Sequence, residues 1–94
     1  MILDEVKEKA VPILRKAGIK RAGVFGSAAR GDATATSDVD FLYEVGERPF
    51  TLFDLVDLRD ALQDALGRDV DLVSYNYIHP LLRENILKEA VDIL

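Results

Sequence analysis

Residues 26–42 have the sequence GSAARGDATATSDVDFL, and the rest of the chain is arranged around this stretch. A short apolar run, Ala22–Phe25, comes before it, and a second apolar run, Phe41–Val45, continues from its end. Small residues flanked by glycine between two apolar runs are typical of two strands joined by a turn region. We therefore expect the chemistry of the protein to lie where these two strands meet the turn.

Two carboxylates stand at the start of the second predicted strand. Side chains alternate between the faces of a strand, so Asp38 and Asp40 are expected on one face, with Val39 and Phe41 on the other. Two neighbouring carboxylates repel each other and lose solvation unless a positive charge lies between them. Mg²⁺ prefers oxygen ligands and is often held by one or two carboxylates together with substrate phosphates. The pair therefore predicts a Mg²⁺ site.

The bulk properties limit the classes of protein to which the chain can belong. With 94 residues, 49% of them hydrophobic, residues 1–94 are expected to form a single domain. A net charge of −5 weighs against direct nucleic-acid binding, which needs a concentrated basic surface. Cysteine is absent, which excludes disulfides and thiolate metal ligands. Neither a signal peptide nor a membrane span is predicted, so we expect a cytoplasmic protein.

Periodicity predicts an α/β (α+β) fold in which helices pack against a short sheet. Pro12 is expected to kink or divide the first helix, since an interior proline removes a helix hydrogen bond. Thr51 and Asp54 are predicted to form a near capping box at the start of the second long helix. The predicted elements are an amphipathic helix over Ile2–Ala17 closed by Gly18, strands over Lys20–Phe25, Val39–Val45 and Asp69–Ser74, a helical turn over Ala28–Arg30, and helices over Leu52–Leu66 and Pro80–Leu94.

A third carboxylate, Asp71, stands near the start of the third predicted strand. If that strand lies beside the second, Asp71 can join Asp38 and Asp40 at one sheet edge. Three such carboxylates could hold two metal ions about 3.5–4 Å apart, which clamp the attacking and leaving oxygens of a phosphoryl transfer. Asp71 would then be the acceptor for the proton of the attacking group.

The turn region supplies candidate phosphate ligands. Glycine lets a backbone approach a phosphate closely, so Gly26, the Ser27 hydroxyl and the N–H groups that open a helical turn predict an anion site. Arg30 is predicted either to neutralise phosphate charge or to form a local ion pair. Ser37 is predicted either to contact the nucleotide or to serve as a turn or strand-cap residue.

The motif from Gly26 to Asp40, G-S-x-x-R-G followed by S-D-x-D, resembles the signature of the DNA polymerase β-like nucleotidyltransferase superfamily, above all its minimal nucleotidyltransferase (MNT) branch. The resemblance covers nearly the whole chain. It implies a nucleotidyltransferase fold with a short mixed β-sheet and helices packed on one face. It also implies a nucleoside triphosphate substrate and two Mg²⁺ ions, held here by Gly26, Ser27, Asp38, Asp40 and Asp71.

Minimal members of this family are commonly encoded beside HEPN-domain proteins and act as antitoxins. Characterised members transfer AMP from ATP to a tyrosine of the HEPN toxin. The resemblance therefore implies Mg²⁺-dependent AMP transfer from ATP to a hydroxyl of a HEPN partner. Two alternatives stay open. The chain could neutralise a HEPN RNase toxin by binding alone, or it could modify a small molecule, for which a homo-oligomer would have to supply the acceptor groove.

Overall fold

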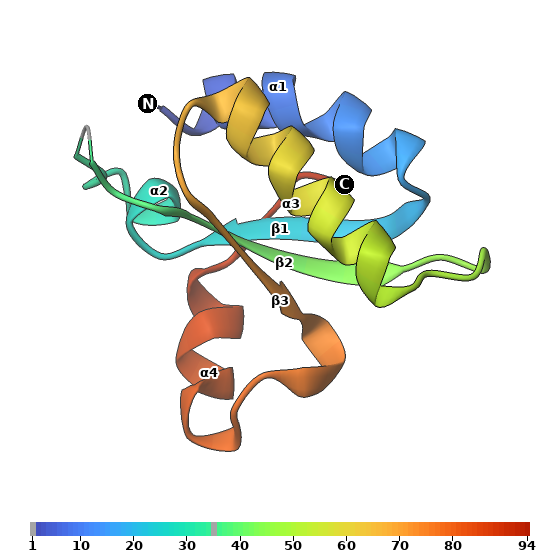
Figure 1. Cartoon of the computed structure of the whole chain (residues 1–94). Helices are drawn as coiled ribbons and strands as arrows, with labels where there is room; N and C mark the ends of the chain where they lie inside the picture. Colours follow the sequence, from blue (N-terminus) through green and yellow to red (C-terminus); the bar gives the residue numbers. More distant parts are fainter. Residues whose placement is uncertain (1, 35) are drawn as a thin grey trace.

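The computed structural model describes residues 2–34 and 36–94, so Ala35 of the predicted polar loop lies outside the described residues. Four strands form a single mixed sheet in the order β3-β2-β1-β4 (Figure 1). The elements are, in chain order, α1 (Leu3–Lys16), β1 (Ile19–Phe25), α2 (Ser27–Arg30), β2 (Val39–Val45), α3 (Leu52–Leu66), β3 (Val70–Ser74), the 3₁₀ turn η1 (Tyr75–Tyr77), α4 (Pro80–Glu89) and β4 (Val91–Asp92).

Strand pairing brings the N-terminal half of β2 between β1 and β3. Strand β1 pairs antiparallel with β2, and Phe25 is the partner of Asp40 in that register. Strand β3 pairs parallel with β2, with α3 as the crossover, and Asp71 is the partner of Asp40. The second and third strands are therefore adjacent, which was the condition for Asp71 to lie near Asp40, and these two acidic residues stand on neighbouring strands.

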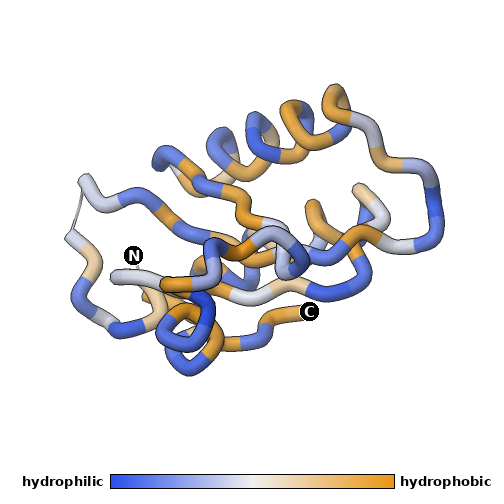
Figure 2. The backbone as a smooth tube through the Cα atoms, turned by 90° about the horizontal axis from the view of Figure 1, so that it is seen from below, coloured by the Kyte–Doolittle hydropathy of each residue, from blue (hydrophilic) through white to orange (hydrophobic). Residues whose placement is uncertain are grey.

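Helices α1 and α3 cover one face of the sheet and enclose the main core with it (Figure 1). Apolar residues recur along α3 between polar ones, as the upper helix of Figure 2 shows, and those that face the sheet are buried. Thr51 caps α3 through the predicted capping box with Asp54. The buried residues contributed by the two helices are Val6, Ala10, Leu14, Leu58, Leu62 and Leu66.

Pro12 lies inside α1 and does not divide it, so that alternative is wrong. The helix continues from Leu3 to Lys16 because its apolar stripe packs on the core: Val6, Ala10 and Leu14 are all fully buried. Packing of an amphipathic face outweighs the loss of one backbone hydrogen bond. No helix in the described ranges is long and apolar enough to cross a membrane.

The expectation that the helices pack on one face holds for α1 and α3 but not for α4. Helix α4 lies on the opposite side of the sheet (Figure 1), where Ile86 and Ala90 pack against a second cluster formed by Leu42, Tyr75 and Ile78. The reason is the alternation along β2. Since Phe41 points into the main core, its neighbour Leu42 points to the other face and needs a cover of its own.

The predicted helix from Pro80 to Leu94 ends at Glu89, so its last part is wrong. Ala90 leaves the helical region with ψ of 140°, and Val91–Asp92 form β4, antiparallel to β1. Ile93 then donates its N–H to the Ala22 carbonyl at 2.9 Å and is buried. A short apolar run fits a helical or a strand period equally well, and pairing with the edge of β1 decides between them.

Candidate functional site

The predicted acidic residues lie near the end of the sheet where β1 ends and β2 begins. Figure 2 shows alternating polar and apolar segments where the chain enters β2, at the left of the view. Val39 and Phe41 are buried in the main core, so the alternation places Asp38 and Asp40 on the other face, the one that α4 partly covers. In β3, the buried Val70 precedes the exposed Asp71, which shares that face with Asp40.

Asp40 has the most perturbed electrostatic environment of the acidic side chains. Burial raises the pKa of its carboxyl first, and the negative charges of Asp71 and Asp38 raise it further, whereas Arg30 lowers it. Repulsion from both neighbours means that the three carboxylates are close enough to influence one another. The sequence expectation that Asp38, Asp40 and Asp71 come together at one edge is consistent with this coupling.

In the described parts of the chain, no three His, Cys, Asp or Glu side chains converge tightly enough to hold a metal ion as they stand. Asp38 and Asp71 are exposed, so their side chains can rotate without disturbing the core. The available donors are carboxylate oxygens, the ligands that Mg²⁺ prefers, and the repulsion at Asp40 would be relieved by a cation. The residues therefore fit Mg²⁺ in donor type, after a change of side-chain rotamers.

Gly26 is tied to Asp40 by close packing. Its φ of 72° lies in a region that L-residues rarely adopt, and an added Cβ would overlap the Asp40 carboxylate oxygen Oδ2. Only glycine satisfies both conditions, because it has no Cβ. Gly26 also caps α2, which confirms the predicted helical turn over Ala28–Arg30 with Ser27 as its first residue.

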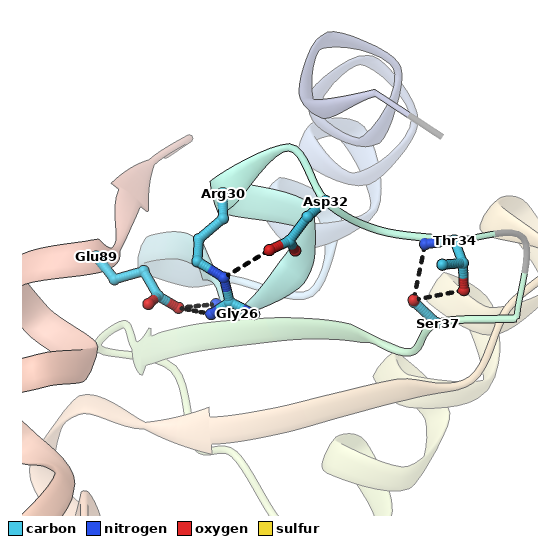
Figure 3. Close-up of polar contacts among 6 residues, drawn as sticks. All are labelled: Gly26, Arg30, Asp32, Thr34, Ser37 and Glu89. Atoms are coloured by element: carbon cyan, nitrogen blue, oxygen red, sulfur yellow. Dashed lines mark hydrogen bonds and ion pairs between the residues drawn. The ribbon is translucent and has the colours of Figure 1, made fainter.

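A carboxylate from the far end of the chain occupies this turn. Glu89 Oε1 accepts the Gly26 N–H at 2.6 Å and a bond from Arg30 Nη1 at 2.9 Å (Figure 3). Arg30 Nε also donates to Asp32 Oδ2 at 3.1 Å. Both partners raise the pKa of the Arg30 guanidinium, and Asp32 has the larger effect. In this structure Arg30 forms the local ion pairs that were one of its two predicted roles, and its contact with phosphate stays a prediction.

Ser37 holds the loop that leads into β2. Its hydroxyl accepts the Thr34 N–H at 2.9 Å and lies 3.0 Å from the Thr34 hydroxyl (Figure 3). This is the turn role that the sequence predicts as one alternative, and a nucleotide contact is not needed to explain it.

Sequence reasoning missed two residues near the site. Arg68 donates to the Thr34 carbonyl and Glu89 caps the turn, and neither contact has a local sequence signal, because each joins segments more than 30 residues apart.

A small groove lies beside Asp71, between β3 and α3. Asp71 is on its wall, and the other lining residues come from α3 and β3: Leu52, Leu55, Val56, Arg59 and Leu72. A larger cavity lies between α1 and α3 and includes Lys16, Arg48 and Asp57, but none of the predicted site residues. Asp71 is therefore the one predicted site residue that lines either of these two hollows.

Comparisons with known proteins identify the family and the fold of the chain. The sequence matches the family described as a nucleotidyltransferase domain over residues 2–93. A protein of Methanocaldococcus jannaschii, provisionally named a protein adenylyltransferase, is 52% identical over 94 residues, the full length of both chains. A solved structure described provisionally as a minimal nucleotidyltransferase is 40% identical, with a TM-score of 0.79 over 95% of this chain and 90% of its own.

A more distant likeness extends the fold comparison. A solved complex of a tri-AMPylated HEPN toxin of Shewanella oneidensis with an MNT antitoxin contains a chain that is 19% identical to this one. Its TM-score is 0.72, and the match covers 97% of this chain and 71% of that chain. At this identity the likeness concerns the fold.

Proposed function

This chain belongs to the nucleotidyltransferase domain family, and from that premise we propose that it transfers AMP from ATP to a hydroxyl of a partner protein. The acceptor in this proposal is a tyrosine of a HEPN toxin, and the outcome is neutralisation of that toxin. Support comes from the adenylyltransferase name of the M. jannaschii relative and from the AMPylated HEPN toxin in the S. oneidensis complex.

The observation that carries the proposal is the register of β2 against β1 and β3, which places Asp40 close to the turn at Gly26. Asp40 lies opposite Phe25, the residue before Gly26, and beside Asp71 on β3. Hydrogen-bond donors of the turn at Gly26, which can bind an anion, therefore lie next to carboxylates of Asp40 and Asp71, which can bind a cation. A nucleoside triphosphate bound with a divalent cation presents this pair of charges, so the geometry suits it.

The proposed roles in transfer are those that the family resemblance implies for these residues. The Gly26 N–H and the Ser27 hydroxyl would bind the β- and γ-phosphates, and Arg30 would add positive charge beside them. Asp38, Asp40 and Asp71 would hold Mg²⁺, which when bound offsets the charge of the triphosphate. The acceptor oxygen forms a bond to the α-phosphorus while the bond from that phosphorus to the bridging oxygen breaks, and pyrophosphate leaves with the electron pair. The Asp71 carboxylate accepts the hydroxyl proton.

The test is an intact-mass measurement on both chains. The protein is incubated with MgCl₂, ATP and a candidate HEPN partner protein from the same organism. A gain of one or more AMP groups on the partner is expected, and it should be lost when Asp38→Asn and Asp40→Asn are combined. Asp69→Asn is the matched control, because Asp69 is an exposed acid near the same edge that is given no role in transfer. Transfer by the double variant at the wild-type rate would contradict the proposal.

Neutralisation by binding alone is the second candidate, and exposed apolar residues at the start of α3 favour it. Leu52 and Phe53 are 75% and 83% exposed, close to the groove that contains Asp71. If the wild type and the double variant protect the partner's RNA substrate equally well and no mass change occurs, the protein acts by occlusion. If only the wild type protects it, transfer is required.

A further inference from the structure

Glu89 holds the two donors that the proposed function assigns to phosphate. Its Oε1 atom accepts the Gly26 N–H at 2.6 Å and a guanidinium N–H of Arg30 at 2.9 Å, and its side chain is 28% exposed (Figure 3). A carboxylate oxygen and a phosphate oxygen are both anionic acceptors, and they satisfy the same donors with similar geometry. One donor set cannot fully serve both at once.

The position of Glu89 is set by the way the chain leaves α4. Glu89 is the last residue of that helix, and Val91, two residues later, pairs with Val24 of β1. This pairing brings the helix end to the turn that follows β1. Helix α4 itself has no buried residue, and Ile86 and Ala90 pack on the second cluster only in part. The contact is therefore held by an element with little packing of its own.

The negative charge of Glu89 opposes the binding of a triphosphate at the same place. Glu89 adds a fourth negative group to Asp38, Asp40 and Asp71, and its charge is among those that raise the pKa of the Asp40 carboxyl. A triphosphate entering this place without displacing Glu89 would meet uncompensated repulsion. If Glu89 swings away, it frees the Gly26 N–H and one face of the Arg30 guanidinium, and it removes that repulsion.

We propose that Glu89 is an internal competitor of the nucleotide: its carboxylate occupies the Gly26 and Arg30 donors in the free protein and must leave before the triphosphate binds. This inference rests on the proposed nucleotide site and adds to it an autoinhibitory contact from the C-terminal segment. It makes nucleotide affinity depend on how firmly α4 and β4 are held, which is a property that contacts of a partner with this segment would change.

The test compares nucleotide affinity in Glu89→Gln and wild type by calorimetric titration with ATP and MgCl₂. The amide of the variant keeps the size of the side chain and removes its charge, so we expect ATP to bind about three- to tenfold more tightly. Glu84→Gln is the matched control, since Glu84 is an exposed acid on the same helix and its replacement changes the net charge equally. The control should bind ATP with wild-type affinity.

A second readout follows the contact itself. In ¹H–¹⁵N spectra the Gly26 amide is expected to shift on Glu89→Gln, and to shift in the wild type when ATP and MgCl₂ are added. Glu89→Asp keeps the charge but shortens the reach by one methylene, so it should also bind ATP more tightly if the contact competes. Unchanged or weaker ATP binding by both variants would overturn the inference, because Glu89 would then position Arg30 rather than block it.

The two proposals fail in different ways. If the partner receives AMP but neither Glu89 variant gains affinity, the inference falls and the proposed function stands. If ATP binds and the Glu89 variants bind it more tightly, while no AMP is transferred, the inference stands and the proposed function falls. If no variant binds ATP, the nucleotide site is absent and both are wrong.

Discussion

At the scale of single residues, Gly26 carries the strictest requirement. Gly26→Ala would place a Cβ on the Asp40 carboxylate and force a φ of 72° on an alanine. We expect a loss of about 1–3 kcal/mol in the free energy of unfolding and at least a hundredfold fall in AMP transfer, because the strained φ and the overlap are relieved only if the turn or the Asp40 carboxylate moves. Urea denaturation and the mass assay measure the two effects.

Gly31→Ala is the comparison for that variant. Gly31 also has a positive φ, of 83°, but an added Cβ meets no atom within 4 Å. It should lose about 1 kcal/mol of stability from backbone strain and keep most of its transfer activity. Equal loss of activity in the two variants would show that backbone strain in the turn, and not the contact between Gly26 and Asp40, controls the site.

Asp40 provides a prediction about charge. Burial and two neighbouring carboxylates raise its pKa in the folded state, so ionisation of Asp40 opposes folding. This cost to the free energy of unfolding is absent below the unfolded-state pKa, because Asp40 is then protonated in both states. It grows as the pH rises from the unfolded-state pKa through the higher folded-state pKa. In EDTA, Asp40→Asn should therefore melt about 1–4 °C above wild type at pH 7.5, with a smaller difference at pH 4.

The same melting experiment with MgCl₂ tests the link to a cation. An ion shared by the carboxylates removes the repulsion that the variant removes by mutation, so Mg²⁺ should raise the melting temperature of wild type more than that of Asp40→Asn. If the variant melts below wild type in EDTA at pH 7.5, the repulsion is not the controlling interaction at this position.

At the scale of elements, patterns within one segment were predictable from the sequence. Strand β2 has the predicted bounds, Val39–Val45, and α3 ends before Gly67 as its periodicity indicates. Features that depend on distant segments were not. The stretch from Val91 to Leu94 fits both a helical and a strand period, and it forms a strand because it pairs with the open edge of β1. The Glu89 contact spans 63 residues and could not be predicted for the same reason.

The C-terminal strand can be tested by two substitutions close together. Ile93 is 6% exposed and packs in the main core, whereas Val91 is 36% exposed. Ile93→Ala should cost about 2–4 kcal/mol of unfolding free energy, and Val91→Ala less than about 1 kcal/mol. Equal costs in urea denaturation would mean that the end of the chain does not dock on β1 as described.

At the scale of the whole molecule, the candidate site exists only in the folded state. Its residues come from α2, β2, β3 and the end of α4, and the sheet order β3-β2-β1-β4 brings these elements together. Unfolding separates them, so ATP with Mg²⁺ should bind the native protein alone and stabilise it. At a hundred times the dissociation constant the gain is about 2.7 kcal/mol, which corresponds to a rise of about 10–20 °C in melting temperature for a domain of this size.

This rise should depend on both halves of the site. In the variant that combines Asp38→Asn and Asp40→Asn, the cation ligands are weakened while the Gly26 turn is kept, so most of the rise should disappear in a thermal-shift titration. Glu89→Gln should reach a given rise at a lower ATP concentration than wild type, because its neutral amide competes less strongly for the Gly26 and Arg30 donors. An equal rise in the double variant and the wild type would place the nucleotide elsewhere, with the larger cavity between α1 and α3 as the next place to examine.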